Sequence, residues 1–288
     1  MPSTRRFVAV ARERGHRVRV LNPTRVEMLL ETGRGHLYVK HRRIPYPDAV
    51  IPRIAPSVAS YGLAVVEQLE ASGTVALNGA QAVGVSRNLL RVLQRLSASG
   101  IAVPATVMAH EAANLKAMLS MVGGVPVLVK LLQGNERKST MVCETVASLE
   151  AALDAVLGLG HNLVVQQYVR GAKEVRALVV GGRVVAAMER LRSKKSKKKA
   201  GRYQPWALTP AQEAVIERTA RTLQLELCSV DVLVTRAETR VFEVDALPQL
   251  PEFEQVTKVD AAAAVVARAE ALVEAASKKA ANSGRGKS

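Results

Sequence analysis

The sequence predicts a mixed α/β and α+β protein, with a small parallel sheet near the N-terminus and antiparallel hairpins farther along. In residues 1–55, short β-branched runs are combined with a charged helical stretch, which is typical of a small parallel sheet. Two later segments, residues 174–191 and 228–248, are each predicted to form two strands joined by a short turn. With 288 residues, of which 48% are hydrophobic, the chain can build two or three lobes with buried cores.

The N-terminal lobe is expected to hold a helix over Arg5–Arg14, ended by Gly15, followed by strands in Val18–Pro23 and Asp48–Ile54 with a polar hairpin between them. A lobe of this kind normally opens with an apolar strand, and no residues before Phe7 supply one. We therefore expect that the lobe lacks its first strand, or that the true N-terminus lies upstream.

The remaining elements follow from periodicity and from turn residues. Gly181 and Gly182 allow the positive φ of a two-residue turn, and Pro104 marks its strand as an edge strand. Thr209, followed by Pro210, caps a helix. We expect helices over 57–72, 86–99, 112–121, 148–157, 210–223 and 260–276, strands over 74–78, 101–109, 125–132 and 162–169, a solvated loop over 191–205, and a basic disordered tail over 273–288.

Composition and charge disfavour several classes of protein and favour an anionic partner. No apolar run approaches the roughly 20 residues of a membrane span, and charges interrupt the N-terminus where a signal peptide needs apolar sequence, so we expect a cytoplasmic protein without a membrane partner. Cys143 and Cys228 lack the spacing of a zinc site or a disulfide framework. The net charge of +16 favours an anionic partner such as nucleic acid, a nucleotide, the ribosome or an acidic peptide, and the 3% aromatic content disfavours single-strand stacking.

Three acidic residues of the second hairpin are candidate metal ligands. Glu243 and Asp245 share a strand face, and a turn centred on Ala237 places Asp231 opposite Glu243. Three carboxylates on one face repel one another unless a cation neutralises them, and Mg²⁺ prefers such oxygen ligands. The alternative is an exposed acidic face that pairs with Arg176 or Arg190.

Two basic residues are candidates for phosphate contacts. Lys130 ends the apolar strand VPVLVK and could neutralise phosphate, although lysines also end strands for solubility. Arg176 shares a face of the first hairpin with Glu174, where it could clamp a phosphoryl group or pair with Glu189.

Together these segments resemble the RimK-type ATP-grasp ligases. The resemblance rests on the order of VIPRI (50–54), GGVPVLVK (123–130), VVQQYV (164–169), EVRALVVGGRVVAAMER (174–190), VDVL (230–233) and EVDALPQL (243–250). It implies a pre-ATP-grasp lobe over residues 1–84, a two-lobed ATP-grasp domain over 85–272, and the tail over 273–288. Its cofactors would be ATP and Mg²⁺, or Mn²⁺ in its place.

The resemblance also implies a function. Enzymes of this type add glutamate to the C-terminus of a ribosomal protein: a carboxylate takes the γ-phosphoryl group of ATP, and an amine displaces phosphate from the acylphosphate. The partners would be ATP, an amino acid and an acidic protein or peptide acceptor, ribosomal in the type case, and a homo-oligomer is left open.

Residue by residue, the resemblance assigns roles to this chain. Asp231 and Glu243 match the metal carboxylates, with Asp245 in place of Asn. Lys130 matches the phosphate lysine, and Arg176 the arginine of Asp-x-Arg, in which Glu174 replaces Asp. The adenine-binding hinge segment corresponds to Gln166, Gln167, Tyr168 and Val169.

The sequence departs from the family pattern in several places. The glycine-rich loop reads LLQGNERKST (131–140) with one glycine, Leu89 replaces a second lysine, and Gln167 replaces Glu. The loop that carries polar Asn, His and Arg-Gly residues has become SKKSKKKAGRYQP (193–205). A second hypothesis is therefore a catalytically degenerate protein that keeps nucleotide or metal binding, and a third is binding of nucleic acid or the ribosome through this loop and the tail.

Overall fold

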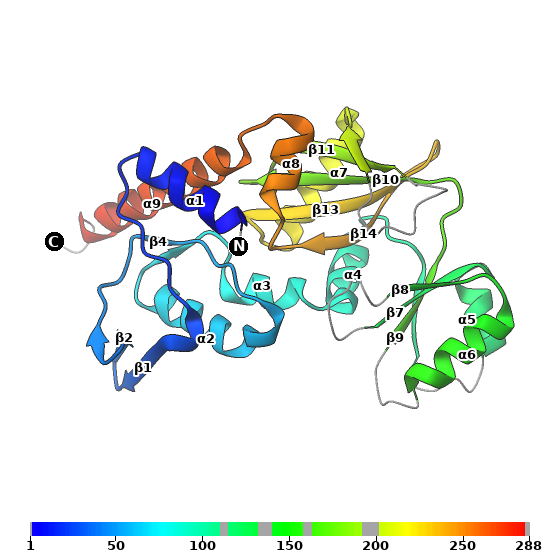
Figure 1. Ribbon diagram of the computed structural model, residues 1–288, viewed down its shortest axis with the longest axis horizontal. Helices are drawn as coiled ribbons and strands as arrows, with labels where there is room; N and C mark the ends of the chain where they lie inside the picture. The colour runs from blue at the N-terminus through cyan, green and yellow to red at the C-terminus, as the bar shows by residue number, and fades with distance from the viewer. Residues whose placement is uncertain (1, 110–114, 132–139, 158–162, 192–201, 286–288) are drawn as a thin grey trace. The chain divides into compact units, whose positions relative to one another are not determined.

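The computed structural model describes residues 2–109, 115–131, 140–157, 163–191 and 202–285. The chain divides into two units. The first comprises Met1–Arg87, Val175–Val230 and Asp245–Ser288, and the second comprises Asn88–Glu174 and Asp231–Val244. Figure 1 labels the helices and strands of both.

The N-terminal part of the first unit contains two small sheets. Three strands form an antiparallel sheet in the order β1-β2-β3, and β4 pairs with β5 in parallel. The prediction of a parallel sheet is thus confirmed for two strands, but it was wrong for Val18–Pro23, where residues 18–22 belong to no helix or strand and Pro23 begins η1. The elements are α1 Pro2–Glu13, η1 Pro23–Arg25, β1 Val26–Glu31, β2 Arg34–Val39, β3 Arg42–Arg43, β4 Ala49–Val50, η2 Pro56–Val58, α2 Ala59–Ala71, β5 Val75–Ala76 and α3 Ala80–Ser86.

A five-stranded sheet follows later in the chain, in the order β12-β11-β10-β13-β14. Gly181 and Gly182 have φ of 60° and 74° between β10 and β11, as the hairpin prediction requires. Thr209 and Gln212 form a reciprocal capping box at the start of α7. The elements are β10 Lys173–Val180, β11 Arg183–Leu191, β12 Arg202–Pro205, α7 Pro210–Thr222, β13 Leu227–Val234, β14 Thr239–Asp245, α8 Leu250–Thr257 and α9 Ala261–Arg285.

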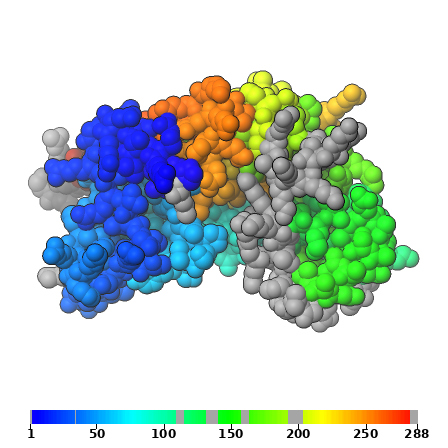
Figure 2. All heavy atoms as spheres, in the orientation of Figure 1, coloured from blue at the N-terminus to red at the C-terminus, as the bar shows by residue number. Residues whose placement is uncertain are grey.

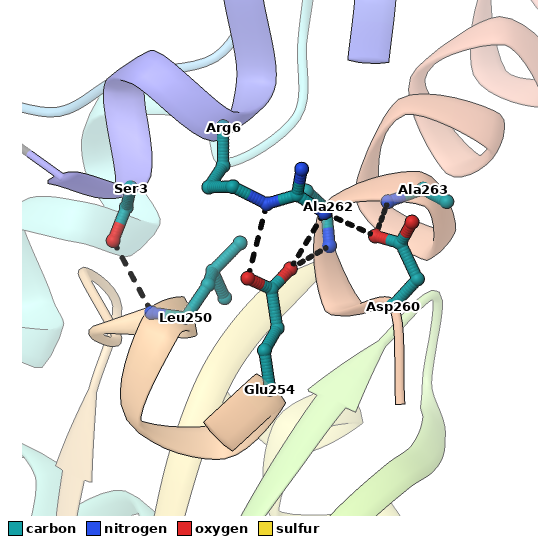
Figure 3. Close-up of polar contacts among 7 residues, drawn as sticks. All are labelled: Ser3, Arg6, Leu250, Glu254, Asp260, Ala262 and Ala263. Atoms are coloured by element: carbon teal, nitrogen blue, oxygen red, sulfur yellow. Dashed lines mark hydrogen bonds and ion pairs between the residues drawn. The ribbon is translucent and has the colours of Figure 1, made fainter. Parts of the chain in front are cut away.

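The N-terminal helix α1 is held against α8 and α9, as Figures 1 and 2 show. Phe7 and Val10 join a core that includes Phe253 and Val265. In Figure 3, Arg6 donates to Glu254 at 3.1 Å and also to Asp260, while Glu254 accepts from the backbone of Ala262. The first helix is therefore fixed by apolar burial together with charge-assisted hydrogen bonds.

The second unit contains a four-stranded antiparallel sheet in the order β6-β9-β7-β8. Pro104 lies two positions before the first residue of β6, which is an edge strand as predicted. Helices α5 and α6 lie over one face of this sheet (Figure 1). The elements are α4 Leu89–Ala98, β6 Thr106–Ala109, α5 Leu115–Met121, β7 Val127–Leu131, β8 Thr140–Cys143, α6 Val146–Leu157 and β9 Leu163–Gln167.

Two expectations, for the loop over 191–205 and for the C-terminal tail, need correction. The loop expected over 191–205 contains β12, because residues 202–205 gain backbone partners along β11. The tail expected to be disordered from residue 273 is helical through Arg285, since its alanines favour helix and Lys278 pairs with Glu274 one turn away. Helices α3 and α8 were not anticipated. In the described part of the chain, no helix is long and apolar enough to cross a membrane.

An ion-pair cluster between Glu270 of α9 and two residues that follow α1 should make the stability of the protein depend on pH under acidic conditions. Glu270 accepts from Arg14 at 2.8 Å and contacts His16 Nε2 at 2.7 Å, and the Arg14 hydrogen bond lowers the pKa of Glu270 to about 2. A depressed carboxyl pKa contributes stability above the unfolded value of 4.5, and this contribution is lost as the pH falls toward 2.

We expect Glu270→Gln to remove this contribution. The free energy of unfolding in urea, measured at pH 6 and at pH 3, should differ less between the two pH values in the variant than in the wild type. Glu274→Gln, which removes an exposed i,i+4 pair on the same helix, is the control and should change the pH dependence little. Equal pH dependence in the wild type and Glu270→Gln would contradict the prediction.

Candidate functional site

One face of the four-stranded sheet carries the predicted phosphate lysine. Lys130 lies opposite Val164 in the ladder between β7 and β9, and Leu128 lies opposite Gln166. Directly opposed residues share a face, so Lys130 and Gln166 point to the same side of the sheet. The alternate residues of these strands, among them Val129 and Val165, pack with α5 and α6 on the other side. The sheet thus has an apolar core face and a face that presents polar side chains.

Lys130 is held over an aromatic ring. Its side chain is buried, with the residue 8% exposed, and Nζ lies 5.2 Å from the ring centroid of Phe242. A cation over a ring face is attracted by the ring quadrupole, which stabilises the lysine side chain in this buried position. Phe242 directly precedes Glu243 on β14, so the contact ties the lysine strand to the strand that carries a predicted metal ligand.

Gln166 offers a buried acceptor on the same face. It is fully buried, and its Nε2 donates to Thr106 Oγ1 at 2.9 Å. Its Oε1 is buried without a hydrogen-bond partner among the described residues. A buried unpaired acceptor is costly, so this oxygen suits a ligand that carries an N–H or O–H donor.

The hinge segment borders a cavity of about 290 Å³. Its backbone is fixed where the Gln167 N–H donates to Ala105 O at 2.8 Å, and the Gln167 side chain accepts a hydrogen bond from Arg240. Arg240 was not among the residues predicted from the sequence, because nothing local to Arg240 or Gln167 indicates the contact. The cavity is lined by Val122, Gly123, Gly124, Val125, Pro126, Gln167, Tyr168, Val169, Arg170 and Arg240.

The predicted metal carboxylates lie on β13 and β14. Asp231 is buried, and Glu243 and Asp245 are half-buried residues of one strand face. The backbone N–H of Thr235 donates to Glu238 O across the turn. Thr235 and Glu238 thus flank a two-residue turn, and the residue of β14 that lies opposite Asp231 stays a prediction.

The described residues contain no group of three or more His, Cys, Asp or Glu side chains that could hold a metal ion. The three-carboxylate cluster therefore stays a prediction. Glu243 and Asp245 share a face because they lie two positions apart on β14. Asp245 also accepts a hydrogen bond from the backbone N–H of Leu247 at 2.8 Å.

Arg176 lies on β10 in the first unit, where it is 8% exposed. Its guanidinium lies 3.7 Å from Glu252 of α8 and 5.9 Å from the ring of Tyr203. Glu189, the ion-pair partner weighed from the sequence, accepts a hydrogen bond from Gln204 at 2.8 Å. Glu174 is the second residue of β10, after Lys173, and is half-buried. Its role and that of Arg176 stay predictions.

Leu89 occupies the position at which the family pattern has a second lysine. It is 5% exposed at the start of α4 and packs with Leu93 and Val164, on the sheet face that carries Lys130. An apolar contact thus stands where a phosphate contact was expected. The segments 132–139 and 192–201, which hold most of the glycine-poor loop and the lysine run, lie outside the described residues.

Comparison with known proteins covers nearly the whole chain. Residues 86–269 match the model of the RimK-like ATP-grasp domain, and residues 1–83 match that of the RimK pre-ATP-grasp domain. A probable alpha-L-glutamate ligase 1 of Shewanella amazonensis is 36% identical over 271 residues, 92% of this chain and 90% of the relative. A probable alpha-L-glutamate ligase of Thioalkalivibrio sulfidiphilus is equally similar, with the same coverage.

Solved structures show the fold. The ATP-grasp ligase PsnB complexed with its minimal precursor superposes with a TM-score of 0.76 at 19% identity, covering 94% of each chain. A RimK domain ATP-grasp protein from Sphaerobacter thermophilus gives a TM-score of 0.67 at 20% identity, covering 91% of this chain and 93% of the other.

Proposed function

Because this chain belongs to the RimK-like ATP-grasp family, we propose that it is a ligase that uses ATP to join an amino acid to a carboxylate of a protein or peptide. The observation that carries the proposal is the polar face of the four-stranded sheet. There a buried lysine and a buried unpaired acceptor, Lys130 and Gln166, share one side of two paired strands. Such a face suits a nucleotide, which needs positive charge near its phosphates and hydrogen bonds to its base.

Names of related proteins support the same chemistry. The curated relatives are called probable alpha-L-glutamate ligases, and PsnB structures include complexes with precursor, Mg and ADP. In the proposed reaction, the acceptor carboxylate attacks the γ-phosphorus of ATP and ADP leaves. The amine of the incoming amino acid then attacks the acylphosphate carbon and expels phosphate, which forms the amide bond. We propose glutamate as the added amino acid.

Within this chain, Lys130 would neutralise phosphate charge from a position held by Phe242, and the hinge segment 166–169 would bind adenine. The donor chemistry around β14 fits Mg²⁺, because Glu243 and Asp245 are hard oxygen ligands on one strand face. Mg²⁺ is usually bound by one or two carboxylates plus substrate phosphates, so it does not need a preformed cage of three protein ligands. When bound, the ion would neutralise charge on the phosphates.

A turnover assay tests the proposal. With ATP, Mg²⁺, glutamate and peptides that end in acidic residues, we expect release of ADP and phosphate together with a mass increase of the peptide. Glu243→Gln should lower turnover by at least ~100-fold, because loss of a ligand to a catalytic ion removes several kcal/mol of charge stabilisation. Glu144→Gln, an exposed carboxylate at the end of β8, is the control. Full turnover by Glu243→Gln would contradict the assigned role.

The buried Leu89 favours a second candidate, a family member that binds nucleotide without turnover. Calorimetric titration with ATP and Mg²⁺ separates the candidates. Binding without product formation, for every amino acid and acceptor offered, would support the second. Absence of ATP binding would contradict both.

A further inference from the structure

Two arginines of the first unit carry buried nitrogen atoms without partners. Nε and Nη1 of Arg53 and Nε of Arg87 are buried and have no hydrogen-bond partner within the described part of the chain. A buried unpaired donor of a charged group costs more than a neutral one, because the lost hydration is not replaced. Each such donor needs an acceptor, and a bound ligand can supply one.

The backbone brings these arginines close to one acidic group. Arg53 follows β4, and Arg87 caps the end of α3, where its Nη2 donates to Ile54 O at 2.6 Å. Burial lowers the pKa of both guanidinium groups, and the nearby charge of Asp245 offsets this only in part. Counted over these three groups alone, and with no Mg²⁺ bound at Asp245, the local charge is about +1.

The charge balance and the free donors indicate the ligand. A monovalent carboxylate brings the local charge to zero, whereas a phosphate dianion would leave it at −1. Guanidinium groups match the planar geometry of carboxylates, and their charge persists after burial. We propose that Arg53 and Arg87 bind a carboxylate of the ligase substrate, either that of the free amino acid or that of the acceptor's C-terminus. The inference rests on the proposed function for the identity of the substrate.

Calorimetry of the full-length protein without nucleotide tests this site separately from catalysis. The probes are L-glutamate, an N-acetylated tripeptide that ends in glutamate, and inorganic phosphate. We expect one of the two carboxylate probes to bind, and Arg53→Gln and Arg87→Gln each to weaken that binding by at least ~10-fold, which corresponds to ~1.4 kcal/mol. Arg43→Gln, an exposed arginine of β3 in the same unit, is the matched control and should bind as the wild type does.

The probe that binds identifies the source of the carboxylate. The proposal is overturned if neither carboxylate probe binds the wild type, if the two variants bind it unchanged, or if only phosphate binds in an arginine-dependent way. Carboxylate binding by a protein that shows no turnover would uphold the site while contradicting the ligase function.

Thermal unfolding without ligand separates binding from a structural role. Removing a charged group whose buried nitrogen atoms lack hydrogen-bond partners should leave the ligand-free protein as stable or more stable, so Arg53→Gln should have an unchanged or raised Tm. A lowered Tm, or failure of the variant to fold, would show that Arg53 supports the fold and would overturn the proposal.

Discussion

Replacing Lys130 with methionine is expected to lower both ATP affinity and ligase turnover, with turnover falling by at least ~100-fold. Methionine keeps the length and apolar stem of the side chain but removes the ammonium group over Phe242. Because Lys130 is buried, bulk water would not screen its charge from a phosphate, and its loss would not be replaced by solvent. ATP affinity is measured by calorimetry and turnover by release of ADP.

The same sheet supplies a control for this substitution. Lys116 is exposed on α5, the helix that covers the opposite face of the four-stranded sheet. Lys116→Met changes the net charge of the protein by the same amount and should leave ATP affinity within about twofold. If Lys130→Met binds ATP as tightly as the wild type, the polar face of this sheet does not hold the phosphates.

Local sequence signals predicted the parts of this face that depend on strand identity. The apolar strand that ends at Lys130 and the strand that contains Gln166 both formed where expected, and strand alternation then sets which side chains share a face. The turn at Gly181 and Gly182 and the helix cap at Thr209 were also predicted correctly. Each depends on one or two residues, because glycine adopts positive φ and the threonine side chain accepts a hydrogen bond at a helix start.

Features that depend on pairing between distant segments could not be read in this way. Arg240 and Gln167 are 73 positions apart, so neither residue predicts the other. Strand β12 forms only because β11 supplies its partners. The face on which Asp231 lies also depends on such pairing, because a shift of one residue between β13 and β14 would move its side chain to the other face of the sheet. The prediction of a disordered tail was also wrong, because it gave the positive charge of the tail more importance than the helix propensity of its alanines.

Replacing Asn78 with alanine is expected to destabilise the protein by about 3–4 kcal/mol, because several buried backbone groups lose their partners at once. Asn78 is 2% exposed. Its Nδ2 donates to Leu227 O at 2.7 Å and to Ala246 O at 3.3 Å, and its Oδ1 accepts from the backbone N–H groups of Glu226 and Leu227. One side chain thus joins the segment after β5 to the start of β13 and the end of β14.

Two further variants show which contacts of Asn78 matter, with the free energy of unfolding in urea as the measurement. Asn78→Asp keeps the acceptor but turns a second carboxylate oxygen toward two carbonyl oxygens, so it should be at least as destabilising as alanine. Asn22→Ala is the control, because Asn22 caps a short 3₁₀ helix at the surface, where loss of a cap costs about 1 kcal/mol. If Asn78→Ala were no more destabilising than Asn22→Ala, water would have to replace the buried side chain. The joint between these segments would then depend on apolar packing alone.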